Sequence, residues 1–119
     1  MATTITRKTT SFDATDKIPG RLASQIARAL MGKTSVGYQP NVDAGDFVIV
    51  KNAGKMKWTG KKMDQKVYHH HTAHPGGLRT KTLKNMWAAD PTEVLRMAVS
   101  RMLPKNKHRT PRMIRLTVE

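Results

Sequence analysis

A short apolar run, Phe47-Val-Ile-Val50, constrains the fold more than any other segment of the chain. It is rich in β-branched residues and lies between Gly45-Asp46 and Asn52-Ala-Gly54, two sequences that favour turns. A continuous apolar run of this length is typical of a strand that is buried on both faces. We therefore expect a central strand here, with other elements packed on each side of it.

Helical periodicity appears on both sides of this strand in the sequence. Residues 20–31 carry apolar side chains three and four positions apart, and Gly32 follows as a helix stop. Residues 83–88 form a second expected helix, for which Thr82 is a suitable N-cap. The positions expected to be buried on the first helix are Leu22, Ala23, Ile26, Ala27 and Leu30.

A third helix has the clearest start signal. Asp90 is a suitable N-cap, Pro91 suits the first helical position, and Glu93 occupies the position of a capping-box partner. The periodic pattern stops at Pro104. The broad apolar stripe of this helix comprises Val94, Leu95, Ala98, Val99, Met102 and Leu103.

The remaining segments are basic and irregular. Residues 113–118 alternate like a terminal strand, and residues 104–119 form a basic C-terminal segment that ends in it. Residues 1–11 are interpreted as a basic N-terminal arm lying on a partner, and residues 61–81 as a long loop or extended arm. Helices interleaved with short strands predict one α/β layered domain spanning residues 1–119.

Positive charge is the main signal for function. The chain has 22 Lys and Arg against 8 Asp and Glu, a net charge of +14, and a pI near 10.7. Residues 51–84 contain nine basic side chains with Asp64 as their one acid, and residues 101–115 contain six with none, whereas charges cancel over residues 13–46. Such regional charge favours a polyanionic partner, because a simply solvated surface mixes both signs.

Other locations and partners are less consistent with the sequence. No apolar run approaches the roughly 20 residues that a membrane span requires, so nucleic acid is favoured over a membrane. The Thr-rich start lacks the apolar region of a secretory signal. The chain has no cysteine, which excludes disulfides and thiolate zinc sites and is weakly consistent with the cytosol.

Gly32-Lys33-Thr34 resembles the end of a phosphate-binding P-loop, but its context is wrong. A P-loop needs a glycine five residues before Gly32, where the chain has Ala27, and it needs a strand before the loop. Here a predicted helix precedes the loop, and the C-terminal end of a helix dipole repels phosphate. These residues are therefore interpreted as a helix stop.

Four histidines, in His69-His70-His71 and at His74, suggest metal binding, RNA contact or packing beside Tyr68. Alternate residues of a strand share a face, so at most His69 and His71 share a metal ion directly, and Asp64 is the one nearby carboxylate. We favour contact with bases, phosphates or 2′-hydroxyls.

Evidence for catalysis is weak. A hydrolase without cysteine needs an activated hydroxyl, and Thr72, beside the histidines, lacks a glycine-framed elbow. The best enzymatic alternative is a metal-assisted nuclease, and the best non-enzymatic alternative is an architectural DNA binder. Charge by itself does not separate DNA from RNA.

Basic and aromatic residues alternate in Lys55-Met-Lys57-Trp58-Thr-Gly-Lys61-Lys62, with Lys66 and Tyr68 close behind. Such groups neutralise phosphates and stack on unpaired bases. Trp58 is interpreted as a core anchor, whereas the consecutive Lys61 and Lys62 are expected to be exposed.

Five motifs in register resemble the universal L-thirteen family of large-subunit ribosomal proteins across nearly the whole chain. They are Gly20-Arg21-Leu22-Ala23, Tyr38-x-Pro40-x-x-Asp43-x-Gly45-Asp46, Asn52-Ala53-x-Lys55-x-x-x-Thr59-Gly60-x-Lys62, Tyr68-x-His70-His71-Thr72 with Gly76-Gly77, and Ala98-Val99-x-x-Met102-Leu103-Pro104-Lys105. The chain departs from the family pattern before the first helix, at Asp16-Lys-Ile-Pro19, and after Lys105, and it ends at Glu119 where relatives continue.

The resemblance implies a three-layer α/β/α domain around a small, mainly parallel sheet. It implies a structural protein of the cytoplasmic large ribosomal subunit that binds 23S-type rRNA, lies among other large-subunit proteins and acts early in assembly. It implies no catalytic activity, cofactor, metal or small-molecule substrate. Together with the charge pattern, it gives the following candidate RNA-binding residues: Arg7, Lys8, Arg21, Lys55, Lys57, Lys61, Lys62, Lys66, Tyr68, His70, His71, His74, Arg79, Lys81, Arg101, Lys105, Lys107, Arg109 and Arg112.

Overall fold

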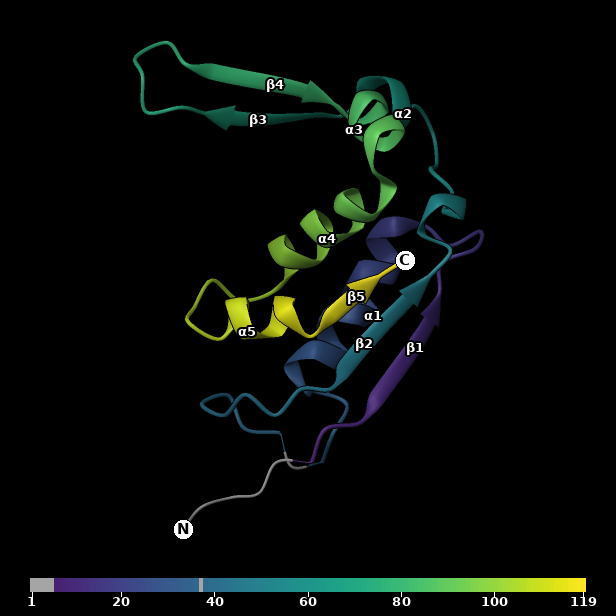
Figure 1. Cartoon of the computed structure of the whole chain (residues 1–119), viewed down its shortest axis with the longest axis vertical. Coiled ribbons are helices and arrows are strands. Elements are labelled where there is room, and N and C mark those ends of the chain that lie inside the picture. The colour runs from purple at the N-terminus through teal and green to yellow at the C-terminus, as the bar shows by residue number, and fades with distance from the viewer. Residues whose placement is uncertain (1–5, 37) are drawn as a thin grey trace.

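A computed structural model describes residues 6–36 and 38–119 of the chain (Figure 1). The elements follow in the order β1 (Thr9–Asp13), α1 (Pro19–Met31), β2 (Phe47–Lys51), a 3-10 turn η1 (Ala53–Lys55), α2 (Lys62–Gln65), β3 (Val67–His71), β4 (Leu78–Thr82), α3 (Leu83–Ala89), α4 (Pro91–Met102), α5 (Arg109–Ile114) and β5 (Leu116–Val118). The α/β class is confirmed.

A three-stranded parallel sheet lies at the centre of the body, in the order β1-β2-β5. The predicted strand, β2, is the middle one: Val48 pairs with Thr10 on one side and Leu116 on the other. Parallel neighbours need a crossover connection, which α1 supplies between β1 and β2 and the later helices supply between β2 and β5.

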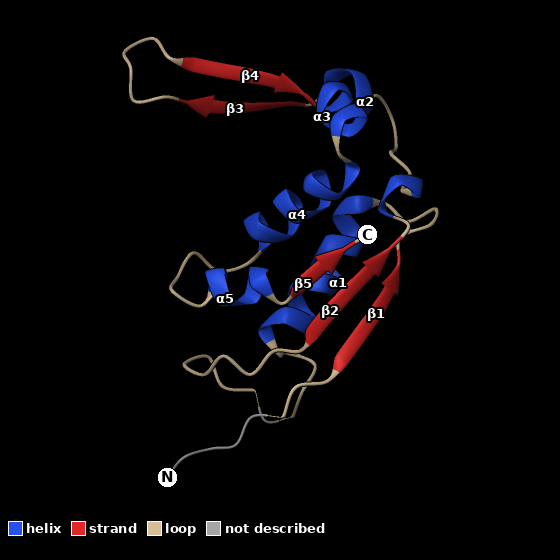
Figure 2. Ribbon diagram, in the orientation of Figure 1, coloured by secondary structure: helices blue, strands red, loops and turns tan. Residues whose placement is uncertain are grey.

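Helices cover one face of this sheet among the described residues (Figure 2). Val48 and Val50 are fully buried toward α1 and α4, whereas on the opposite face Phe47 is 46% exposed and Ile49 is half-buried. The expectation that β2 is buried on both faces is therefore wrong. The third layer of the expected α/β/α arrangement is also absent from the described part of the chain, because the open face of the sheet carries no helix.

The positions predicted to be buried on the first helix are confirmed. α1 buries Leu22, Ala23, Ile26, Ala27 and Leu30 against the sheet and α4. It ends where expected, because Gly32 adopts a left-handed φ of 82° that glycine tolerates without steric cost. The P-loop-like residues after it are therefore a helix stop.

The caps of α3 and α4 also follow the sequence, with one correction. The Thr82 hydroxyl accepts a hydrogen bond from the Asn85 backbone N–H, and the Asp90 carboxylate accepts one from the Thr92 N–H at 3.0 Å. The capping box predicted for Glu93 requires the Asp90 N–H as donor, but that group donates to the Met86 carbonyl at 2.9 Å and closes α3.

Both ends of the chain form more regular structure than expected. Residues 9–11 of the predicted basic arm belong to strand β1, and residues 1–5 lie outside the described residues. At the C-terminal end, Met113 and Ile114 finish helix α5 instead of starting a strand, and β5 is confined to residues 116–118. Pro111 is accommodated because it lies in the first turn of α5, where its missing N–H has no intrahelical partner.

The predicted loop or arm of residues 61–81 is mainly a β-hairpin. β3 and β4 pair antiparallel from Val67 with Thr82 to His71 with Leu78, and the chain reverses through residues 72–77. The hairpin extends away from the body (Figure 1), and the Cα radius of gyration is 16.1 Å. A compact chain of this length would have a radius of about 13.5 Å. The hairpin is therefore a projecting arm.

Candidate nucleic-acid interface

The hairpin has two chemically different faces because neighbouring residues of a strand point in opposite directions. The cross-strand pairs Tyr68–Lys81 and His70–Arg79 share one face. The other face carries Val67, His69 and His71 with Leu78 and Thr80 opposite. The candidate residues His70 and His71 are therefore not brought together.

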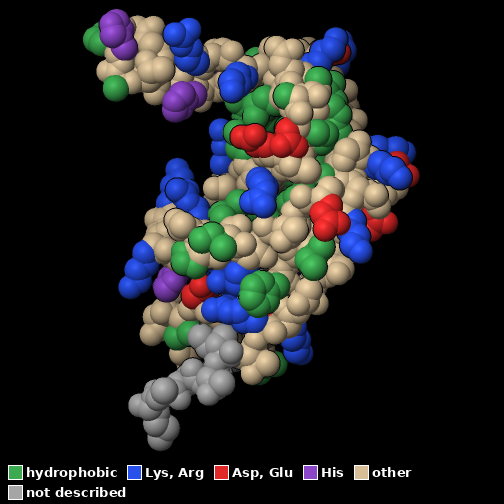
Figure 3. All heavy atoms as spheres, viewed as in Figure 1, with side chains coloured by type: hydrophobic (Ala, Val, Ile, Leu, Met, Phe, Trp, Pro, Cys, Tyr) green, Lys and Arg blue, Asp and Glu red, His purple; other side chains and the backbone are tan. Residues whose placement is uncertain are grey.

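The face with Tyr68, His70, Arg79 and Lys81 lies opposite Glu93, Met97 and Arg101 of α4. Together with His69 and Met86, these residues line a cavity of about 370 Å³, which we call the basic groove. Figure 3 shows Lys and Arg side chains both on the hairpin and on the facing edge of the body. Glu93 is the one acidic side chain among the described residues that line the groove, so its potential is positive.

Tyr68 joins the hairpin to the body. The Arg101 guanidinium carbon lies 5.2 Å from the centroid of the Tyr68 ring, and the Lys66 ammonium lies 5.3 Å from it. Both distances are within the range of cation–π attraction. Burial raises the pKa of the Tyr68 hydroxyl, and the nearby positive charge of Arg101 opposes that shift. The phenol is therefore neutral at physiological pH and available as a hydrogen-bond donor.

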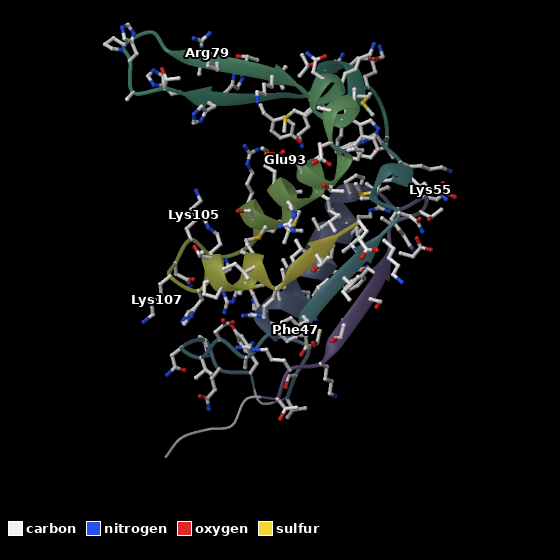
Figure 4. All side chains as sticks on the ribbon, in the orientation of Figure 1. Phe47, Lys55, Arg79, Glu93, Lys105 and Lys107 are labelled. Atoms are coloured by element: carbon white, nitrogen blue, oxygen red, sulfur yellow. The ribbon has the colours of Figure 1, made fainter. Side chains whose placement is uncertain are left out.

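Two other groups of basic residues lie near the hairpin. Lys61 and Lys62 are exposed at the start of α2, and they line a shallow hollow with Lys66. Lys105 and Lys107 project from the loop between α4 and α5, on the side toward which the hairpin extends (Figure 4). Neither group lines the basic groove itself, so a polyanion would have to extend beyond the groove to reach them.

Most of the predicted RNA-binding residues are solvent-exposed. Arg109 is half-buried at the start of α5, and Tyr68 is half-buried in the groove. The exposed candidates are Lys8, Arg21, Lys55, Lys57, Lys61, Lys62, Lys66, His70, His71, His74, Arg79, Lys81, Arg101, Lys105 and Lys107.

The exposed candidates do not form one patch. Lys55 projects on the side of the body opposite to Lys105 and Lys107 (Figure 4). Lys57 lies 3.6 Å from Asp16 in an exposed ion pair, which leaves it only partly free to bind phosphate. The residues that gather around the hairpin therefore form the better candidate interface.

Two predicted contacts have internal roles instead. The guanidinium of Arg7 donates to the backbone carbonyls of Gly45, at 2.6 Å, and Asp43, at 2.9 Å. Arg112 is 2% exposed, and its Nε lies 3.5 Å from the Asp43 carboxylate. Arg112 is thus too deeply buried to reach RNA, and Arg7 already has partners, so we remove both from the candidate interface.

Trp58 is not among the candidate RNA-binding residues, because its sequence context is interpreted as that of a core anchor. The Trp58 ring is half-buried and stands edge-on to Trp87, with centroids 5.8 Å apart. The Trp58 ring lies beside the groove, and the Lys66 ammonium lies 6.0 Å from its centroid. The alternation of lysines with Trp58 and Tyr68 was the available signal, but it did not reveal that the two rings share one cavity.

Membrane-spanning helices and metal-binding clusters are absent from the described part of the chain. No helix there is long and apolar enough to cross a bilayer. Within residues 6–36 and 38–119, no group of three or more histidine or acidic side chains is arranged to hold a metal ion. His69 instead shares a 3.1 Å hydrogen bond with the Thr80 hydroxyl, and His74 lies 2.8 Å from the Pro75 carbonyl oxygen.

Comparison with known proteins gives one consistent result. Residues 7–118 match the family model described as ribosomal protein L13. The "Large ribosomal subunit protein uL13" of Aquifex aeolicus is 56% identical over 87% of this chain and 72% of its own length. The protein of the same name from Thermotoga maritima is 48% identical over 96% of this chain and 76% of its own length.

Proposed function

Because the chain belongs to the ribosomal protein L13 family, we propose that it is a structural constituent of the large ribosomal subunit that binds 23S-type rRNA through the basic groove. The family is structural and non-enzymatic. The proposal includes a place among other large-subunit proteins in the cytoplasm and a role early in subunit assembly. The basic groove, with the lysines near the hairpin, is the observation that carries the proposal.

The donors that line the groove suit double-stranded RNA. Arg79, Lys81 and Arg101 have long side chains that reach phosphates, while His70 and the neutral Tyr68 hydroxyl suit 2′-hydroxyls. A-form RNA presents phosphates and 2′-hydroxyls on its surface and hides most base edges in its deep groove. Recognition in this groove would therefore depend mainly on RNA shape.

Salt dependence is the clearest test of this binding mode. Each basic side chain that meets a phosphate releases condensed counterions, an entropic gain that falls as salt rises. With about six to ten such contacts, affinity should fall by roughly 10³–10⁵ between 50 and 200 mM salt, taking duplex DNA as the guide. The measurement is a filter-binding titration with a 23S rRNA fragment, and binding that ignores salt would refute the proposal.

Replacements of lysine by alanine, compared per charge removed, locate the interface. Replacing Lys61 and Lys62 by alanine should weaken binding and make the salt dependence shallower, whereas replacing Lys51, an exposed lysine on β2 remote from the hairpin, should have little effect per charge removed. Circular dichroism should show an unchanged fold in both cases. Equal losses from the two replacements, per charge, would contradict the assignment to this face.

The same material separates the alternative functions. Structured RNA should outcompete duplex DNA of equal phosphate number, because the proposal depends on A-form geometry and 2′-hydroxyls. The RNA should be recovered intact after incubation with Mg²⁺, whereas a metal-assisted nuclease would cleave it and a chelator would stop the cleavage. Preferential DNA binding would favour an architectural DNA protein.

The geometry of the interface supports the proposed assembly role. Basic residues on a projecting hairpin and on the body can hold two RNA segments at a fixed separation, which helps the RNA to fold. Reconstitution of the large subunit from purified parts tests this role. Omitting the chain from the first step should stall assembly, and late addition should not fully rescue it. Full rescue by late addition would contradict an early role.

A further inference from the structure

A second cavity, of about 200 Å³, lies next to the basic groove between the N-terminal end of α1, α4 and the base of the hairpin. We call it the aromatic pocket. Trp58 and Tyr68 line it, and Tyr68 and Arg101 belong to both the pocket and the groove. The complete lining comprises Ile18, Pro19, Gly20, Trp58, Thr59, Lys62, Lys66, Tyr68, Val94, Ala98, Arg101 and Met102.

A cation now covers the two aromatic rings of this pocket. The Lys66 ammonium lies 6.0 Å from the Trp58 ring centroid and 5.3 Å from the Tyr68 ring centroid. Lys66 is nevertheless a solvent-exposed residue on a flexible stem, so its ammonium can leave the rings at small cost. A nearby phosphate would attract it more strongly than either ring does, since cation–π attraction at exposed sites is modest.

The pocket has the chemistry of a site for a base with its phosphate. Its walls are apolar at Val94, Ala98 and Met102, it carries two aromatic rings, and it has three cations at Lys62, Lys66 and Arg101 with no acid among its lining residues. The volume is below the roughly 300 Å³ of drug-sized sites, which suits a single planar ring system. The buried Trp58 Nε1–H also lacks a hydrogen-bond partner among the described residues.

We infer that the aromatic pocket receives one unpaired nucleobase, which stacks on Tyr68 and Trp58 while Lys66 moves from the rings to the flanking phosphate. The inference rests on the proposed function and adds to it. The basic groove reads the shape and charge of paired RNA, whereas the pocket selects RNA in which a base lies outside a helix beside the groove. Lys62 and Arg101, at the rim, neutralise the neighbouring phosphates.

The test compares two probes that differ only in their bases. They are an adenosine hexaribonucleotide and its abasic counterpart, which carries the same phosphates and riboses. The full chain with Trp87→Phe is used, because Trp58 is then the only tryptophan in the sequence and reports from the pocket. The adenosine hexamer should quench Trp58 fluorescence and bind about 5- to 150-fold more tightly than the abasic hexamer, as expected for stacking of one base.

Substitutions at Tyr68 give the matched control. Tyr68→Phe keeps the ring and should retain most of the preference for the adenosine hexamer. Tyr68→Leu keeps apolar bulk without a flat ring and should bring the ratio of the two hexamer affinities close to one. If the leucine variant fails to fold, the Tyr68→Phe, Trp87→Phe protein still tests the inference. A base stacked in the pocket must change the Trp58 emission of that protein, and unchanged emission would contradict the inference.

The possible failures are distinguishable. If the chain binds the 23S rRNA fragment with steep salt dependence, but both hexamers bind equally and leave Trp58 emission unchanged, the pocket inference is wrong and the proposed function stands. If neither the hexamers nor the rRNA fragment binds at low salt, the proposed function fails as well. The same preference for the adenosine hexamer in the Tyr68→Phe and Tyr68→Leu variants would also overturn the inference.

Discussion

Replacing Asp43 by asparagine removes the negative charge that pairs with Arg112 and Arg115. The Asp43 carboxylate accepts two hydrogen bonds from Arg115, at 2.8 and 2.7 Å, and lies 3.5 Å from Arg112. Arg115 also donates to the Leu30 carbonyl at the end of α1. One carboxylate thus links the loop before β2 to α5 and, through Arg115, to α1.

The cost of this substitution follows from burial. Arg112 and Arg115 are 2% and 9% exposed, so without Asp43 two guanidinium groups stay buried without a counter-charge. Removing one partner of a buried pair typically costs 3–5 kcal/mol, and the 16% exposure of the Asp43 side chain reduces our expectation to about 2–4 kcal/mol. For a chain of this size the melting temperature would fall by roughly 8–20 °C.

The titration of Asp43 should follow the same contacts. Burial by itself raises the pKa of this carboxyl, but the hydrogen bonds and charge of Arg115, with the charges of Arg7 and Arg112, lower it below the ordinary value of 3.8. The resulting stability is complete above pH 3.8 and is lost as pH falls through the folded-state pKa. Asp43→Asn should flatten this acid limb of the stability curve.

Asp16→Asn is the matched control, because it makes the same change in net charge. Asp16 lies 3.6 Å from Lys57 in a pair whose side chains are 67% and 68% exposed, so its loss should cost less than about 1 kcal/mol. Asparagine also tolerates the left-handed φ of 59° at this position. Urea unfolding followed by circular dichroism measures both variants, and equal small shifts of the midpoint would refute the reasoning about burial.

Three further predictions concern stability, each measured by thermal or urea unfolding. Gly45→Ala should destabilise the fold by about 1–3 kcal/mol because a Cβ would meet the backbone carbonyl of Leu30, whereas Gly20→Ala, with open space, should be nearly neutral. Val99→Asp should abolish cooperative unfolding because it places an unpaired charge at a fully buried position, and a folded variant would contradict this. Hydrogen bonds from Thr15 and Asn52 lower the pKa of the Asp13 carboxyl to about 2. Asp13 should therefore add stability that is lost as the pH falls from 3.8 to 2.

The sequence predicted the elements whose signals are local. α1, with its glycine stop, and α4, with Asp90 as its cap, were both found within a residue or two of their bounds because periodicity and caps act within one helical turn. β2 was recognised by its β-branched run. The capping box at Glu93 failed because α3 ends directly before α4, and the Asp90 N–H completes α3 instead.

Features that depend on distant contacts were not predictable. Nothing local shows that Thr9–Asp13 pairs with β2, because its residues are mostly polar and the strand forms at the edge of the sheet. Arg112 looked like a surface cation until the fold placed Asp43 beside it, 69 positions away in the sequence. The hairpin was recognised only as an arm, since its exposed strands lack apolar alternation.

The same distinction explains why the candidate site was only partly foreseen. Charge density along the chain located the basic stretches, but their grouping depends on how the hairpin is held against α4. A two-stranded hairpin is at best marginally stable by itself in water. Its base is fixed by the hydrogen bond from the Leu83 N–H to the Lys66 carbonyl and by the contacts of Tyr68 with Arg101.

Few contacts of the hairpin are buried, so RNA binding and hairpin order are thermodynamically coupled. A ligand that binds the ordered hairpin more tightly than the disordered one must stabilise it, and a net charge of +14 adds a self-repulsion that a polyanion relieves. The free protein should therefore exchange the amide hydrogens of β3 and β4 much faster than those of β2, and bound rRNA should slow the hairpin selectively. The basic groove would then be a binding surface completed by its own ligand, built on a body that is stabilised by its hydrophobic core and by the contacts of Asp43 with Arg112 and Arg115.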